Sequence, residues 1–120
     1  MVKKKQQNKS SERLRLESIM AQCYGTINYW KEPLLLFKYT DGVKTFADNA
    51  GAYWFLYEVN RLLVDSDRIV SYKLVVNDGK VDILRDGEKV RKISYTDCPE
   101  GEWEFFYSPF DKVFMWNMEY

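Results

Sequence analysis

The chain has 120 residues, 18 basic and 18 acidic residues, no histidine and two cysteines. This length fits one domain whose hydrophobic core needs no disulfide or metal ion. The lack of histidine excludes histidine-dependent triads and zinc sites with histidine ligands, and two distant cysteines cannot form a four-thiolate site. No apolar run approaches the length of a membrane span. We therefore expect a cytoplasmic protein with reduced thiols at Cys23 and Cys98, a disulfide between them being the alternative.

Charge is unevenly distributed along the chain. Residues 1–15 contain six basic residues and one acidic residue, a net charge of +5, so the remaining residues carry −5. Residues 1–10 are polar and have no hydrophobic periodicity, which predicts a flexible basic arm followed by a single domain over residues 11–120. Such an arm can neutralise the phosphates of a nucleic acid. Its basic residues are Lys3, Lys4, Lys5 and Lys9.

The first predicted elements are a short helix and three strands. Ser10 or Ser11 can cap a helix over about residues 11–22. Further on, Asp41-Gly42 has the composition of a tight hairpin turn, because glycine adopts a positive φ without strain. The strands predicted around these features cover residues 26–30, 34–39 and 43–46.

The clearest helical pattern covers about residues 49–64. Asp48 or Asn49 can cap this helix. Its apolar residues recur at intervals of three and four, which places them in one stripe on the helix surface. They are Ala52, Phe55, Leu56, Val59, Leu62 and Leu63. We therefore predict one main amphipathic helix that packs against a sheet.

After this helix, short strands alternate with turns rich in Gly, Asp, Asn and Pro, a pattern typical of neighbouring antiparallel strands. The sequence thus predicts an α+β fold in which an antiparallel β-meander of five to seven strands packs against the main helix. Leu34–Phe37 and Val113–Trp116 are apolar on both faces, so we expect the N-terminal helix or a partner protein to cover the second face. The predicted strands cover residues 70–76, 80–85, 89–95, 103–107 and 113–118.

Paired carboxylates are the remaining option for catalysis. Glu102 and Glu104 share one face of a predicted strand, where two acidic groups can raise a pKa or hold a divalent ion. A solvated strand face explains the same alternation. The Asp-Gly pairs are better explained as turns than as calcium ligands. We therefore expect no catalytic, cofactor or metal site, with a histidine-free enzyme that uses the two glutamates as an alternative.

Aromatic residues make up 17% of the chain, which indicates that some of them lie at a surface used for binding. In the C-terminal half, acidic residues could meet a basic groove of a partner protein and aromatic residues could anchor the contact. The predicted partner-binding residues are Glu100, Glu102, Trp103, Glu104, Phe106, Phe110, Asp111 and Trp116. A nucleic-acid-binding accessory protein that uses the basic arm is the alternative, and a homodimer is compatible with both.

Several segments resemble a bacterial family of unknown function, with a Thr-Asp-Gly-Val turn, a Tyr-Trp helix start and a Glu-Tyr end. The segments are Cys23-Tyr24-Gly25-Thr26, Tyr39–Lys44, Ala50–Trp54 and Glu119-Tyr120. Members of that family are small and occur in bacteria and their mobile elements, phages included. By analogy, the resemblance implies a stoichiometric, non-enzymatic inhibitor that binds a host defence complex in the bacterial cytoplasm, as anti-CRISPR and other anti-defence proteins do.

Overall fold

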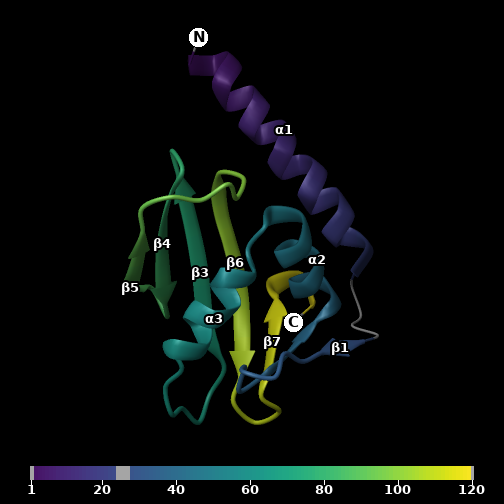
Figure 1. Cartoon of the computed structure of the whole chain (residues 1–120), viewed down its shortest axis with the longest axis vertical. Helices are drawn as coiled ribbons and strands as arrows, with labels where there is room; N and C mark the ends of the chain where they lie inside the picture. The colour runs from purple at the N-terminus through teal and green to yellow at the C-terminus, as the bar shows by residue number, and fades with distance from the viewer. Residues whose placement is uncertain (1, 24–27, 120) are drawn as a thin grey trace.

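The structure is a computed structural model that describes the backbone of residues 2–23 and 28–119, and the side chains of residues 11–22 and 28–119. Seven strands form one sheet, and three α-helices and two short 3₁₀-helices complete the described part (Figure 1). The strands are β1 (Tyr29–Trp30), β2 (Lys38–Thr40), β3 (Val70–Asn77), β4 (Lys80–Arg85), β5 (Glu88–Ile93), β6 (Gly101–Ser108) and β7 (Val113–Trp116). The helices are α1 (Val2–Met20), η1 (Ala21–Cys23), α2 (Asp41–Ala50), α3 (Tyr53–Arg61) and η2 (Asn117–Glu119). The predicted α+β class and the predicted sheet size are confirmed.

The strand order in the sheet is β1-β2-β7-β6-β3-β4-β5. Strands β3, β4 and β5 form the predicted meander, and β6 pairs antiparallel with β3 on its other side. The last strand, β7, lies between β6 and β2 and runs parallel to β2, with Lys38 opposite Val113. This parallel pair brings the C-terminal residues next to the start of α2.

The helices pack on one face of the sheet (Figure 1). In α2, the ring of Phe46 lies 5.0 Å from that of Trp103 and 5.1 Å from that of Phe105, measured between centroids. In α3, the ring of Phe55 lies 5.2 Å from Phe105 and 5.8 Å from Phe114. These ring contacts form an aromatic core between the helices and one face of the sheet, and none of α1, α2 and α3 covers the opposite face (Figure 1).

The predicted hairpin at Asp41-Gly42 is wrong, because α2 begins at Asp41. The carboxylate of Glu119 accepts hydrogen bonds from the Gly42 backbone N–H at 3.0 Å and from Thr40 Oγ1 at 2.6 Å. It thereby satisfies a free N–H group at the first turn of α2, where a negative charge is also favourable. A Cβ atom on residue 42 would lie 2.7 Å from Cδ of Glu119, so glycine is needed here for close approach. The strand predicted over residues 43–46 is part of this helix.

Other boundaries also differ from the predictions. The first helix begins at Val2 instead of near residue 11, and the predicted flexibility of residues 1–10 stays a prediction. The main helix is shorter than predicted, because Gly51 ends α2 in a left-handed conformation before α3 begins at Tyr53. Cys98 is a buried free thiol, which rules out the disulfide alternative.

Candidate functional site

Two of the predicted partner-binding residues are buried. Trp103 is 1% exposed and Trp116 is 7% exposed, and both belong to the core beneath the helices. The indole N–H of Trp103 donates a hydrogen bond to the carbonyl of Pro99 at 3.1 Å. Alternation along β6 placed Trp103 opposite the glutamates, but the sequence did not show that this face is the covered one. Both side chains are therefore core residues in this structure, and their use as anchors for a partner stays a prediction.

The other predicted residues do not form one patch. Glu102, Glu104 and Phe106 alternate with the core residues of β6, so they lie on the face that the helices leave open. Glu100 precedes β6 and Phe110 follows it, so they are separated by roughly 30 Å at the rise of an extended strand. Phe110 and Asp111 are therefore far from the glutamates, and the predicted site divides between two ends of the molecule.

The first of these ends is rich in carboxylates, and we call it the acidic end. A hollow of about 260 Å³ lies between α1, β6 and η2, and a neighbouring hollow of about 250 Å³ lies beside the β3–β4 turn. Together their linings contain seven acidic residues and two basic residues, Arg13 and Lys73. The acidic residues are Glu12, Glu17, Asp78, Asp97, Glu100, Glu102 and Glu104.

Polar contacts on the open sheet face give both predicted glutamates a partner. The ammonium of Lys73 lies 3.1 Å from Glu102, and the hydroxyl of Ser71 donates to Glu104 at 3.0 Å. Lys73 is 36% exposed and Glu102 is 63% exposed, so water screens their ion pair strongly. Glu102 could therefore pair with a cation of another molecule in place of Lys73 with little loss of stability.

Arg13 fixes α1 to the acidic end. Its guanidinium lies 4.0 Å from the ring centroid of Trp103 and 3.1 Å from the carboxylate of Glu17. It also donates hydrogen bonds to the backbone carbonyls of Glu100 and Glu102. Gly101 has a φ of +120° and makes room for this side chain, because a Cβ there would lie 3.0 Å from Cζ of Arg13. No pattern in the sequence predicts this contact, which joins residues far apart in the chain.

Glu119 fixes the other wall of the same hollow. Besides its bonds to Thr40 and Gly42, its carboxylate accepts a hydrogen bond from the Trp116 backbone N–H at 3.0 Å. This bond holds η2, whose residues Asn117 and Met118 line the hollow. The carboxylate of Glu119 thus joins β2, α2 and the end of β7.

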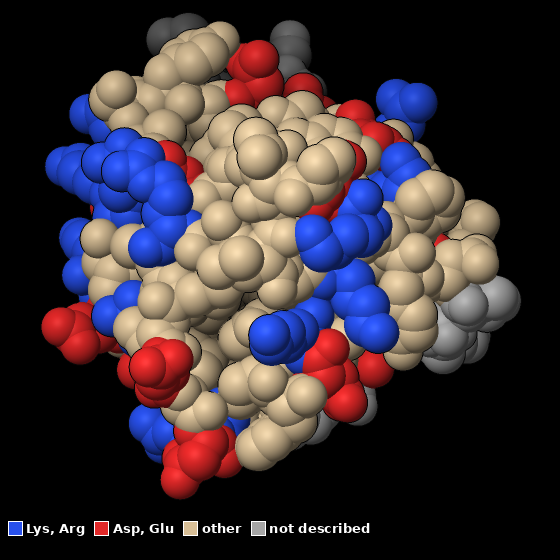
Figure 2. Space-filling view, turned by 60° about the horizontal axis from the view of Figure 1, so that its bottom comes forward, with Lys and Arg blue, Asp and Glu red and all other residues tan. Residues whose placement is uncertain are grey.

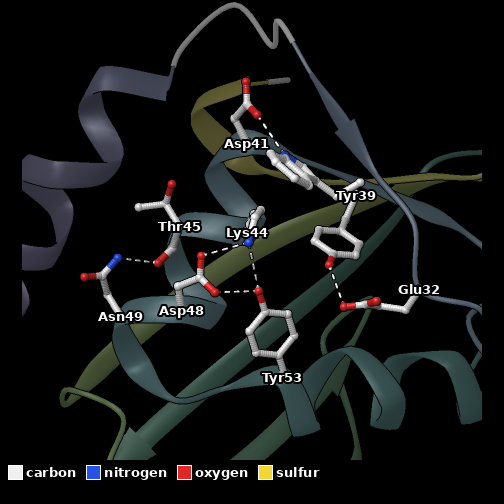
Figure 3. A network of polar contacts seen from close by, with 9 residues as sticks. Glu32, Tyr39, Asp41, Lys44, Thr45, Asp48, Asn49 and Tyr53 are labelled. Carbon is white, nitrogen blue, oxygen red and sulfur yellow. Dashed lines mark hydrogen bonds and ion pairs between the residues drawn. The ribbon is translucent and has the colours of Figure 1, made fainter.

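A separate polar network joins α2 to the start of α3, and a second contact nearby links β2 to the segment before it (Figure 3). Tyr53 donates to Asp48 at 2.5 Å, Lys44 donates to Asp48 at 3.1 Å, and Tyr39 donates to Glu32 at 3.1 Å. The hydrogen bond to Asp48 raises the pKa of Lys44, and burial raises the pKa of Tyr53 and of Tyr39. All three groups therefore stay protonated near neutral pH, which is the opposite of what a nucleophile or general base requires.

The second end of the molecule exposes apolar side chains around a hollow of about 450 Å³, and we call it the apolar end. Leu34 is 78% exposed, Leu36 is 66% exposed, Phe110 is 68% exposed and Val64 is 42% exposed. Asn60 in α3 holds this surface in place, because its side-chain oxygen accepts a hydrogen bond from the Leu36 backbone N–H at 2.8 Å. Figure 2 shows this end, where a surface of residues without charge, drawn in tan, lies between groups of basic and acidic residues. The apolar end comprises Leu34, Leu36, Leu63, Val64, Pro109 and Phe110.

Within the described residues, no group of three or more Cys, Asp or Glu side chains is arranged to hold a metal ion. A search of the described helices finds none that is long and apolar enough to span a membrane.

The fold and these surfaces define a small α+β protein with a one-sided sheet, an acidic end and an apolar end. A model of the Family of unknown function (DUF6876) matches residues 14–120, and the chain belongs to this family. No curated protein and no solved structure matches the chain. The expected membership of a family of unknown function is thus confirmed.

Proposed function

We propose that the protein is a non-enzymatic binding module that presents its acidic end to a basic surface of another protein. The observation that carries this proposal is the excess of carboxylates there: seven acidic residues and two basic residues line two adjacent hollows of a chain whose net charge is zero. Such an excess is unfavourable for the isolated protein, since like charges repel, and it is favourable beside a partner of opposite charge.

The scaffold supports this use of the acidic end. Glu102 and Glu104 lie on β6, two residues and therefore roughly 7 Å apart along the strand. Glu17 lies on α1, which Arg13 attaches to the same strand. Carboxylates on regular elements are pre-organised, so a partner would not have to order them on binding.

We further propose that the partner is a host defence complex and that the protein inhibits it stoichiometrically, in the manner of anti-CRISPR and other anti-defence proteins. The resemblance to small proteins of bacteria and mobile elements supports this choice of partner. A protein groove that binds nucleic acid is strongly basic, so it has the charge that the acidic end would complement. Occupying such a groove would block the nucleic acid without any chemical step.

Affinity capture from the native host, followed by mass spectrometry, tests the proposal. We expect wild-type protein to capture a basic partner and the double variant Glu102→Lys/Glu104→Lys to lose it. The variant Glu88→Lys, which has the same net charge as either single variant Glu102→Lys or Glu104→Lys, changes an exposed acidic residue outside both ends of the molecule, so it should retain the partner. Retention of the partner by Glu102→Lys/Glu104→Lys at wild-type level would contradict the assignment.

Binding of nucleic acid is the second candidate, and the course of α1 favours it. The N-terminal half of α1 projects away from the sheet and its covering helices (Figure 1). Lys3, Lys4, Lys5 and Lys9 belong to this half by sequence. Gel-shift assays at low salt should then detect binding of DNA or RNA that is lost when residues 1–10 are deleted. Absence of binding by the intact chain would reject this candidate.

A further inference from the structure

We infer that the apolar end is an interface between two copies of this chain related by a twofold axis. This surface is separate from the acidic end, and the inference goes beyond the proposed binding function. It rests on three features of the apolar end: the exposure of its side chains, the hollow beside them, and the balance of charges around them.

The exposed side chains come from segments that are far apart in the sequence. Leu34 and Leu36 precede β2, Val64 follows α3, and Phe110 lies between β6 and β7. Isolated apolar residues on a surface are common, but a contiguous group of this kind marks an interaction site. The hydrogen bond from Leu36 to Asn60 fixes the group on α3, so the surface is formed before any partner arrives.

The apolar end also has a hollow beside a projecting side chain. Leu36, Leu63, Val64, Tyr107 and Pro109 line the hollow together with Asp65, Ser66 and Lys112, and Phe110, next to Pro109, is 68% exposed. A twofold axis places the same surface opposite itself. The Phe110 ring of one copy can therefore enter the hollow of the other, and the reverse contact forms by symmetry.

The charges near the hollow favour a second copy as the occupant. The segments 31–38, 61–68 and 109–112, which supply the exposed apolar residues, contain five basic and four acidic residues. A twofold interface brings the same surface of both copies together. A rim whose charges all have one sign would therefore repel the rim of the other copy, whereas a rim with both signs can form ion pairs with it. The acidic end, with seven acidic and two basic residues, would repel its copy. The charged residues of these segments, which form the rim, are Lys31, Glu32, Lys38, Arg61, Asp65, Asp67, Arg68, Asp111 and Lys112, and Asp65 and Lys112 line the hollow itself.

Such a dimer leaves both acidic ends exposed. Glu100 and Phe110 lie at opposite ends of β6, so contact through the apolar end directs the two acidic ends away from each other. If each acidic end binds a partner, the dimer is bivalent, which raises the effective affinity for a partner with two basic sites.

Sedimentation velocity over a range of concentrations tests the interface. We expect wild-type protein to form a dimer and the variants Phe110→Asp and Leu36→Asp to raise the dissociation constant at least about tenfold. Matched controls are Tyr95→Asp and Leu14→Asp, which alter side chains of similar exposure, 72% and 66%, outside the apolar end. They should remain dimeric. Circular dichroism of each variant would show that loss of the dimer is not loss of the fold.

A change of the rim alone tests the choice of occupant. The variant Asp65→Lys/Asp111→Lys keeps the apolar centre and makes the rim predominantly basic, so it should dissociate and reassociate partly when salt screens the repulsion. Wild-type protein that sediments as a monomer at every soluble concentration would overturn the inference. A dimer that survives both Phe110→Asp and Leu36→Asp would overturn it as well.

Discussion

The acidic end and the apolar end differ in how charged side chains are used. At the acidic end, Arg13 and Glu119 each make two hydrogen bonds to backbone groups and hold α1, α2 and η2 to the sheet. At the apolar end, Leu34, Leu36 and Phe110 are exposed next to residues that pack in or against the core, among them Tyr107 and Leu63. Charged side chains thus stabilise the fold at the acidic end, whereas at the apolar end they lie only around the exposed apolar side chains.

This difference separates stability from surface recognition. Removing a charged group that bonds to the backbone leaves buried donors or acceptors unsatisfied, which costs more than the bond itself contributes. Removing an exposed apolar side chain leaves nothing unsatisfied in the monomer. Substitutions at the two ends should therefore have opposite effects on folding and on association.

The largest effect is expected for Glu119→Ala. This change removes acceptors from Thr40, Gly42 and Trp116 and takes a negative charge from the start of α2. We expect a loss of about 2–3 kcal/mol in the free energy of unfolding, measured by urea titration. Glu88→Ala, at an exposed carboxylate of β5, is the matched control and should change stability by less than about 0.5 kcal/mol.

Gly42→Ala extends the same test. Its Cβ would displace the Glu119 carboxylate, so it should destabilise the wild type but add little to Glu119→Ala. Full additivity of the two changes would show that Gly42 and Glu119 act independently, against the contact described.

Arg13→Met should have the next largest effect. Methionine retains apolar contact with Trp103 but loses the ion pair to Glu17 and the bonds to the carbonyls of Glu100 and Glu102. We expect a loss of about 1–2 kcal/mol and faster amide hydrogen exchange in the part of α1 around Arg13. Arg15→Met, two positions along the same helix, should leave exchange in these residues unchanged; equal effects would contradict the specific role of Arg13.

The sequence predicted the fold wherever local signals were sufficient. Alternation and turn residues predicted the extents of β3, β4, β5 and β6 closely, and short connections predicted the pairing of β3 with β4 and of β4 with β5. The start of α2 was missed, because its N-terminal acceptor is Glu119, at the far end of the chain. The parallel pairing of β2 with β7 also joins distant segments, and no local pattern encodes it.

The candidate sites were predictable only in part. The acidic character of Glu100, Glu102 and Glu104 was visible in the sequence, and the structure adds Glu12, Glu17, Asp78 and Asp97 around them. The hydrophobicity of residues 34–37 suggested a strand with two buried faces, yet Leu34 and Leu36 are exposed. In a segment without regular secondary structure, the sequence does not show whether an apolar side chain points into the core or into solvent. The apolar end could therefore not be located from the sequence.

Alkaline pH is expected to cause a loss of stability of intermediate size. Burial raises the pKa of the Cys98 thiol from 9.0 to about 12 and that of the Tyr72 hydroxyl from 10.0 to about 12. The unfolded chain releases these protons first, so the stability present below pH 9 is lost progressively between pH 9 and 12. For Cys98 alone we expect a loss of about 1.4 kcal/mol by pH 10.

Urea titrations of wild type and Cys98→Ala at pH 7 and pH 10 would measure this loss. The variant should be less stable at pH 7, since it leaves a small cavity, but should lose clearly less on going to pH 10. Equal losses in both proteins would show that Cys98 ionises as readily in the folded state as in the unfolded state.

The smallest effect on folding is expected at the apolar end, in contrast to the large effects expected at the acidic end. Leu36→Asp changes a side chain that is 66% exposed, and Phe110→Asp changes one that is 68% exposed. At protein concentrations below dimer formation, each should alter the free energy of unfolding by less than about 0.5 kcal/mol. A loss comparable to that of Glu119→Ala would mean that these side chains support the fold of the monomer. If stability is instead unchanged while association is lost, their exposure in the monomer serves contact with another molecule.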